Sequence, residues 1–507
     1  MLCSKTEQPY SLVKRLDTHE ILDLESVCEE SLTFETRRQF LKIAAAGLVA
    51  GTAPEILMAR NAAAASPSRQ ISMWVTSEKK RFESVHSLTW QRAGGPGGSE
   101  TIELTPDQRF QEILGFGAAF TDASCYMFRQ LSEDTRGTLF HELFHPSEMA
   151  LNVCRTCIGA SDYSTELFGY DEGEPDPELG RFSIDHDKAY VLPALREARK
   201  VNPDLFLFSS PWSPPGWMKA NKSMLGGCIR KRYFPSYAQH FVKFLQAYAA
   251  EGVPIQAVTS QNEVDTDQDG RMPACLWGQE YEIEFIARHL GPALESTGLS
   301  TKIWLLDHNY NLWGRVICSL DDAKVRQHCS SVAWHGYVGK ADMISKVHAA
   351  HPDVSMHWTE GGPDYTRPNY ATDWAVWART FSEALANRCS SITGWNLALD
   401  ERGRPNIGPF NCGGLVTIHS ESKEITHSGQ YWALAHFSRA IRRGARRFGS
   451  ASASSNLSHI ACANPDGKSV LVLSNPGPAR TIELRAGTMS VAVPLESDSV
   501  NTLTWQT

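Results

Sequence analysis

Two short segments combine an acidic side chain with residues that bind polar ligands. Ser260-Gln261-Asn262-Glu263 joins a carboxyl group to two amides, and His357-Trp358-Thr359-Glu360-Gly361 carries a second carboxyl group. Two carboxyl groups on opposite sides of a glycosidic bond can cleave it, because one protonates the leaving oxygen while the other stabilises or attacks the oxocarbenium-like centre. The sequence therefore offers Glu263 and Glu360 as candidate catalytic residues.

This chemistry sets a condition on the acid. It must be protonated near neutral pH, so we expect its pKa to be raised by burial or by the neighbouring ionised carboxylate. Asn262 is placed to hydrogen-bond a sugar 2-hydroxyl, a contact that would strengthen in the transition state. An Asn-Glu pair alone is a weak signal, so the interpretation depends on whether the fold brings the two glutamates together.

Eight short apolar runs recur along the chain, and amphipathic stretches such as residues 235–250 and 280–294 lie between several of them. Strands that alternate with helices predict βαβ units and a parallel sheet. Eight units in series predict an α/β fold with a closed (β/α)₈ TIM barrel. The candidate strands are residues 113–120, 151–157, 205–210, 255–260, 302–307, 331–335, 354–359 and 391–397.

The two glutamates follow the fourth and seventh of these strands. A barrel of roughly 250 residues gives about 30 residues to each unit, and the spacing of Glu263 and Glu360 fits three units. The active sites of TIM barrels lie at the carboxyl ends of the strands. We therefore expect both carboxyl groups at one mouth of the barrel.

The segments on either side of the barrel alternate apolar and polar residues and contain turn signals, as short antiparallel strands do. We expect both chain ends to form one side antiparallel β-domain. The predicted division is a signal region and linker at 1–65, N-terminal strands at 66–112, the barrel at 113–436, and the C-terminal part of the β-domain at 437–507.

The N-terminal region has the features of an export signal. Arg37-Arg38 is followed by a short apolar run, residues 43–53, and by four alanines at 62–65. A paired arginine, a moderately apolar core and small residues before a cleavage point predict a twin-arginine signal and a periplasmic or extracellular protein. An N-terminal helix or a single anchor is the alternative. The apolar run is shorter than the ~20 residues that span a bilayer.

Charge and cysteine content narrow the remaining classes. A net charge of −8 without a basic stripe argues against a nucleic-acid partner. The chain has 12 cysteines in no regular framework, and we expect most of them to be free buried thiols. Cys154 and Cys157 have redox spacing but fall in a predicted strand, where residues three apart point to opposite faces.

From about residue 115 to residue 450 the chain resembles glycoside hydrolase family 30, in the glucosylceramidase-like branch. The resemblance implies a TIM barrel with a side β-domain, retaining hydrolysis of β-glycosidic bonds and no metal or other cofactor. The matching segments occur in order: GFGAAFTDA at 115–123, LNVCR at 151–155, SDYS at 161–164, SPWSPPGWMK at 210–219, QNE at 261–263, FIARHLGPAL at 285–294, AWHGY at 333–337, TE at 359–360, GWNLAL at 394–399 and YWALAHFS at 431–438.

The resemblance also implies roles for individual residues. Glu263 matches the acid/base and Glu360 the nucleophile. Four positions match the subsite for the terminal sugar: Asp122, Trp212, Asn262 and Trp395. His335 and Tyr337 lie at the end of the sixth candidate strand and are further candidate substrate-binding residues. The tyrosine hydroxyl could also orient the nucleophile. Arg155 is expected to hold the carboxylates through a buried ion pair.

Departures from the family pattern leave the substrate open. Val264 follows Glu263 where the family usually has proline, and Gly361-Gly362-Pro363 follows Glu360. Both changes affect the rim of the site. Cleavage of glucosylceramide, a β-1,6-glucan, a β-glucoside or a β-xyloside fits the same catalytic centre.

Two rival functions come from different classes. Residues 141–145 read HELFH, which is the HExxH signature of zinc metallopeptidases. Pro146 follows at once and disfavours a helical His145, so we expect a helix end on the barrel exterior. The second rival is a non-catalytic sugar-binding protein, against which the presence of both glutamates argues.

Overall fold

The computed structural model describes residues 69–95 and 97–506. The predicted export signal lies outside these residues. Within them, no helix has the length and apolar character needed to cross a membrane.

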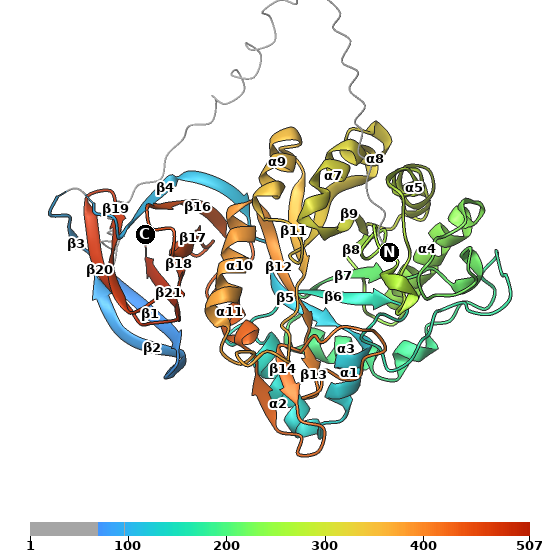
Figure 1. The fold of residues 1–507 in the computed structure, drawn as a ribbon, viewed down its shortest axis with the longest axis horizontal. Coiled ribbons are helices and arrows are strands. Elements are labelled where there is room, and N and C mark those ends of the chain that lie inside the picture. Colours follow the sequence, from blue (N-terminus) through green and yellow to red (C-terminus); the bar gives the residue numbers. More distant parts are fainter. Residues whose placement is uncertain (1–68, 96, 507) are drawn as a thin grey trace, which may run out of the picture. The chain divides into compact units, whose positions relative to one another are not determined.

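Eight parallel strands close into a barrel, which confirms the predicted TIM barrel (Figure 1). Each predicted strand is present, and strands that are consecutive in the chain are neighbours in the barrel, with β12 closing onto β5. The strands are β5 (Gly115–Phe120), β6 (Val153–Ile158), β7 (Phe206–Pro211), β8 (Ala257–Thr259), β9 (Lys302–Asn309), β10 (Cys329–His335), β11 (Ser355–Glu360) and β12 (Cys389–Asn396).

Helices occupy the connections between these strands. The predicted helix at 235–250 is α4 (Phe234–Ala250), and the one at 280–294 runs from α5 (Gln279–Phe285) through a π-helical turn, Ile286–Leu290, into α6 (Gly291–Ser296). The others are α1 (Asp122–Arg129), α2 (Glu133–Phe144), α3 (Val191–Val201), α7 (Trp313–Leu320), α8 (Ala323–His328), α9 (Asp342–Ala350), α10 (Trp374–Ala386) and α11 (Gly429–Ser438). Short 3₁₀ turns cover Asp185–Lys188, Gly216–Met218, Lys231–Tyr233, Gln268–Gly270 and Tyr310–Leu312.

The two flanks of the barrel form one β-domain, as predicted. Its strands pair antiparallel except for β4 with β19. Among the described residues the first strand pairs with the last, since Ile71 lies opposite Trp505. The strands, in spatial order, are β2 (Lys80–Thr89), β1 (Gln70–Ser77), β21 (Ser499–Gln506), β18 (Lys468–Asn475), β17 (Ser458–Ala463), β16 (Arg446–Ser452), β4 (Thr101–Glu112), β19 (Arg480–Ala486), β20 (Met489–Leu495) and β3 (Gln91–Arg92). A separate small sheet contains β13 (Ala398–Leu399), β14 (Val416–Ile418) and β15 (Ile425–His427).

Strand β18 buries both of its faces. Successive side chains of a strand point in opposite directions, so Leu471 and Leu473 enter the core of the β-domain while Val470 and Val472 join the apolar core that surrounds the barrel. The indole of Trp374, at the start of α10, donates a hydrogen bond of 2.7 Å to the carbonyl of Asp498. The β-domain therefore completes the packing of the barrel helix that follows β11.

A β-bulge interrupts β9 near the mouth of the barrel. Leu306 and Asp307 have φ values of 77° and 52°, and the pairing with β10 moves from Leu306 to His308, which leaves Asp307 without a partner residue. Such an insertion turns the following side chain to a new direction. As a result, Asp307 enters the barrel interior while His308 reaches the cavity above it.

Candidate active site

A cavity of about 450 Å³ opens at the carboxyl ends of the barrel strands, as predicted. Both glutamates line it. Glu360 is the last residue of β11, and Glu263 follows the end of β8 by four residues. Other side chains that line the cavity include Asp162, Trp212, Asn262, Asp265, Gln268, His308, Tyr337 and Trp395.

Glu360 is held by two donors. The Arg155 guanidinium, from β6, forms a buried ion pair with Glu360 Oε2, and the Tyr337 hydroxyl donates a hydrogen bond of 3.0 Å to Oε1. The expected ion pair of Arg155 is therefore confirmed, and Tyr337 makes the contact expected of it. The two donors fix the direction in which the carboxylate faces the cavity.

Arg155 also connects Glu360 to a second buried acid. Its Nη2 lies 2.7 Å from both Asp307 Oδ2 and Asn262 Oδ1. Burial would raise the pKa of Asp307, but the guanidinium, with His335 and nearby hydroxyl donors, holds it well below its usual range. Because Arg155 occupies the amide oxygen of Asn262, the Asn262 amide nitrogen is free to donate toward a sugar.

Glu263 has a left-handed backbone, with φ of 55°, which is uncommon for a residue other than glycine and typical of functional sites. Its amide donates a hydrogen bond of 3.0 Å to the carbonyl of Asp307, so the bulge in β9 supports this conformation. Gln268 donates to Glu263 Oε2 at 2.6 Å. The other oxygen, Oε1, faces ring nitrogens of two histidines, at 3.6 Å from His335 Nδ1 and 3.7 Å from His308 Nδ1.

The expectation of a raised pKa for the acid is wrong. Burial does raise the pKa of Glu263, but the interactions with His335, His308 and Gln268 outweigh it and hold the pKa below its usual value. Burial lowers the pKa of His335, yet Glu360, Asp307 and Glu263 together raise it to about 9. At neutral pH these shifts favour a carboxylate at Glu263 and an imidazolium at His335.

His335 is not part of the cavity wall. It is fully buried. Its Nε2 atom lies 3.0 Å from Asp307 Oδ1 and 3.8 Å from Glu360 Oε2. The resemblance implied contact with substrate, but the structure places the ring beneath the carboxylates. One imidazole thus lies next to both candidate catalytic residues and positions them.

Asp122 also lies outside the cavity, contrary to the expectation that it binds sugar hydroxyls. At the start of α1, its carboxylate accepts hydrogen bonds from the amide and hydroxyl of Thr165, at 2.7 and 2.8 Å, and lies 2.9 Å from His186 Nε2. These contacts hold the carboxylate of Asp122 against the loop after β6 and fix that loop.

Asp162, which that loop carries, takes the place expected of Asp122. It lines the cavity, and its buried Oδ1 has no hydrogen-bond partner in the protein. Burial, with Glu360 and Glu263 nearby, raises its pKa well above the usual value. An unpaired buried oxygen in a cavity wall is a docking point for a ligand hydroxyl. Asp162 was not among the site residues predicted from the sequence, although its position four residues after the end of β6 could have pointed to it.

Two tryptophans form an apolar wall of the cavity. The rings of Trp212 and Trp395 stack with centroids 5.0 Å apart, and the Arg155 guanidinium lies 4.6 Å from the centre of the Trp212 ring. Flat aromatic faces pack against the apolar faces of sugars. Both residues therefore lie where the resemblance placed them, beside the amide of Asn262.

The comparisons with known proteins agree with this geometry. Residues 113–441 match the model of the glycosyl hydrolase family 30 TIM-barrel domain, and residues 444–503 match that of the family 30 beta sandwich domain. The chain belongs to glycosyl hydrolase family 30. It is accordingly a glycoside hydrolase, and the interpretations as a zinc peptidase or a sugar-binding protein are set aside.

Relatives within family 30 differ in their named substrates. The chain is 32% identical to an endo-1,6-β-D-glucanase of Neurospora crassa over 80% of this chain and 88% of that one. It is 29% identical to the lysosomal acid glucosylceramidase of Mus musculus, over 76% and 79%. Among solved structures, SrfJ from Salmonella typhimurium superposes with a TM-score of 0.83 at 26% identity, covering 86% of this chain and 100% of the other.

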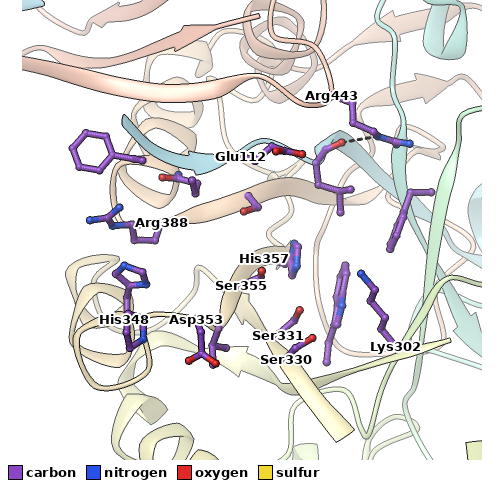
Figure 2. A pocket seen from close by; sticks show the side chains of 18 of the residues that line it. Glu112, Lys302, Ser330, Ser331, His348, Asp353, Ser355, His357, Arg388 and Arg443 are labelled. Carbon is purple, nitrogen blue, oxygen red and sulfur yellow. Dashed lines mark hydrogen bonds between the residues drawn. The ribbon is translucent and has the colours of Figure 1, made fainter. Parts of the chain in front are cut away.

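A second and larger cavity, of about 620 Å³, lies at the opposite end of this family 30 barrel. Figure 2 shows side chains around it from the first residues of barrel strands, among them Lys302, Ser331 and Ser355. In TIM barrels the amino-terminal face serves stability and the carboxyl face carries the active site. Neither glutamate borders the larger cavity, so it is not the catalytic site.

The HELFH segment forms a helix end, as predicted. Helix α2 stops at Phe144, and His145 has extended backbone angles, φ −63° and ψ 136°. Glu142 Oε1 accepts a hydrogen bond of 2.6 Å from the hydroxyl of Tyr431.

The ten cysteines in the described part of the chain are all free thiols, which agrees with the expectation that most cysteines form no disulfide.

Proposed function

We propose that this family 30 enzyme is a retaining β-glycosidase in which Glu360 is the nucleophile and Glu263 the acid/base. The observation that carries the proposal is the unequal setting of two carboxylates in one cavity. Glu360 is paired with a guanidinium, as suits an ionised nucleophile, whereas Glu263 lies beside a histidine that can hold a proton.

The reaction proceeds by double displacement. Glu360 attacks the anomeric carbon while Glu263 protonates the leaving oxygen, and a covalent glycosyl-enzyme forms. Glu263 then removes a proton from water, which releases the sugar with its anomeric configuration retained. The Asn262 amide donates to the 2-hydroxyl and Asp162 accepts from another hydroxyl of the same sugar.

His335 supplies the proton that Glu263 needs. The imidazolium lies 3.6 Å from Glu263 Oε1. A sugar in the cavity excludes water from Glu263, and loss of solvent around this carboxylate favours its neutral acid form over the ion pair with the imidazolium. Substrate binding therefore favours transfer of the His335 proton to the carboxyl group that donates it.

The substrate that we propose first is a β-1,6-linked glucan. One support is the 32% identity to an endo-1,6-β-D-glucanase. The other is a solved structure of an endo-β-1,6-glucanase, which superposes with a TM-score of 0.78. Glucosylceramide is the second candidate because of the similarity to glucosylceramidases. Aryl β-glucosides and β-xylosides complete the panel. Incubation with each substrate and analysis of the products by chromatography distinguishes the candidates and the endo or exo mode.

Two substitutions test the mechanism. Glu360→Gln is expected to abolish turnover, because an amide cannot form the covalent intermediate. Glu263→Gln is expected to slow substrates with poor leaving groups by about 10²–10⁴-fold and activated aryl glycosides far less. Steady-state rates on a series of aryl glycosides measure the difference, and the exposed Glu421→Gln variant is the control.

The stereochemistry gives an independent test. ¹H NMR of the first product formed should show the β-anomer, before mutarotation sets in. A first product with the α configuration would contradict double displacement, whatever the effects of the substitutions.

Export through the twin-arginine route is part of the same proposal. Its support is Arg37-Arg38, the apolar run at 43–53 and the alanines at 62–65. Arg37→Lys with Arg38→Lys, fused to a periplasmic reporter, should keep the protein in the cytoplasm. A fully exported variant would argue for another route.

A further inference from the structure

A side-chain cluster at the catalytic cavity has the geometry of a metal site. One ligand atom each from Glu263, His308 and His335 lies within 4.8 Å of the other two. A cation about 2.0–2.1 Å from tetrahedral nitrogen and oxygen ligands requires those ligands to be roughly 3.4 Å apart. The carboxylate oxygen lies 3.6 and 3.7 Å from the two Nδ1 atoms, so small side-chain shifts would complete the geometry.

Both histidines present an unused nitrogen to this point. His308 Nδ1 and His335 Nδ1 are buried and have no hydrogen-bond partner, although the side chains are only 6% and 0% exposed. Buried polar atoms without partners are rare in proteins and call for a ligand or another explanation. Here two such atoms converge on one carboxylate oxygen.

The opposite nitrogen of each ring is paired with a carboxylate. His308 Nε2 contacts Asp265 Oδ1, and His335 Nε2 lies 3.0 Å from Asp307 Oδ1. In metal sites, a carboxylate on the far ring nitrogen fixes the tautomer and makes the near nitrogen a better ligand. Gln268 holds the other oxygen of Glu263, so all three candidate ligands have a partner that orients them.

We propose that Glu263, His308 and His335 bind one divalent transition-metal cation of the zinc class, and that this cation inhibits the enzyme. Two imidazoles and one carboxylate are ligands that such cations prefer, and the adjoining cavity leaves a fourth position for water. Binding displaces the proton on His335 Nδ1. The inhibition rests on the proposed role of Glu263, whereas the binding does not.

Calorimetric titration of the purified full chain with zinc chloride tests the binding. We expect one zinc per chain and no comparable binding of Mg²⁺, which prefers oxygen ligands. His308→Gln should weaken zinc binding at least about 100-fold, and Asp265→Asn should weaken it about 10–100-fold through the orientation of His308. The matched control is His145→Ala, because His141 and His145 stack at the end of α2 and are the alternative zinc site.

The outcomes separate clearly. Loss of zinc binding in His308→Gln with full binding in His145→Ala supports the proposal. Equal binding by His308→Gln and wild type, or no binding by wild type at 100-fold molar excess of zinc, overturns it. If His308→Gln does not fold, anomalous diffraction from zinc-soaked wild-type crystals decides: a peak among the three side chains supports the site, and any other result refutes it.

An activity assay then tests the inhibition separately. Zinc at the concentration that saturates the calorimetric site should suppress hydrolysis of an aryl β-glucoside, and EDTA should restore it. Zinc that binds at this site without inhibition would leave the metal site standing but would contradict both the inhibition and the role of Glu263 as acid/base.

Discussion

Arg155 contacts Glu360, Asp307 and Asn262 from the centre of the barrel. The sequence predicted its ion pair with the carboxylates and the meeting of Glu263 with Glu360, because the carboxyl ends of barrel strands share one mouth. It did not predict His308 or Asp265 as neighbours of Glu263. Their contacts depend on side chains far apart in the chain, and no spacing rule connects them.

Asp162 lines the cavity where Asp122 was expected from the sequence, and this difference leads to a prediction. Asp162→Asn is expected to lower kcat/KM about 2–10-fold, because a hydrogen bond between neutral groups contributes about 0.5–1.5 kcal/mol. Asp122→Asn should leave kcat/KM within about threefold and lower the free energy of unfolding by ~1–3 kcal/mol, since it weakens the contacts with Thr165 and His186.

Kinetics on an aryl β-glucoside and urea unfolding of both variants provide the measurement. If Asp122→Asn lost more activity than Asp162→Asn and its free energy of unfolding did not change, the prediction would be wrong and Asp122 would belong to the sugar subsite.

At the scale of elements, the apolar runs were sufficient to locate all eight barrel strands. A strand that is buried on both faces appears in the sequence as a nearly continuous run of hydrophobic residues. The bulge at Leu306 and Asp307 could not be found in that way. Both residues have positive φ without being glycine, and their conformation is imposed by contacts such as the one between Asp307 and the Glu263 amide. Tertiary structure overrides local preference there.

The approach of β5 to β6 gives a test of the barrel packing. A Cβ on Gly117 would lie 2.0 Å from the carbonyl oxygen of Val153, and backbone cannot move aside without separating the strands. Gly117→Ala is expected to destabilise the fold by at least ~3 kcal/mol or to yield insoluble protein. Gly137→Ala, exposed in α2 with no atom near the added carbon, should instead stabilise by up to about 1 kcal/mol. Thermal unfolding compares the two variants.

Asp373, just before α10, gives a pH-dependent prediction. Burial raises its pKa from the ordinary 3.8 to about 7, despite the hydrogen bond from Trp377. The folded state therefore favours the neutral acid. The contribution of Asp373 to the free energy of unfolding is greatest below pH 3.8 and decreases as the pH rises to about 7. Asp373→Asn should gain stability relative to wild type across that window.

Urea unfolding at pH 4, 5.5 and 7.5 measures the gain. A stability difference that stays constant over the three pH values would contradict the raised pKa of Asp373.

At the scale of the whole molecule, the alternating patterns at both flanks predicted a single β-domain. They did not reveal that one face of this domain packs on α10 and α11. The sequence does not show which residues side chains such as Val470 and Val472 will contact. Residues 113–441 expressed alone are therefore expected to aggregate, because the helix surfaces that these valines cover would be exposed. Residues 69–507 contain both apolar cores and should remain monodisperse in size-exclusion chromatography.

The pairing of β1 with β21 has a consequence for biosynthesis. Strand β1 is synthesised long before β21, so the β-domain closes only after Ser499–Gln506 has left the ribosome. A premature stop codon within residues 499–506 would leave Gln70–Ser77 with an open edge. Such truncated chains should be recognised by quality-control proteases although their catalytic residues are all present.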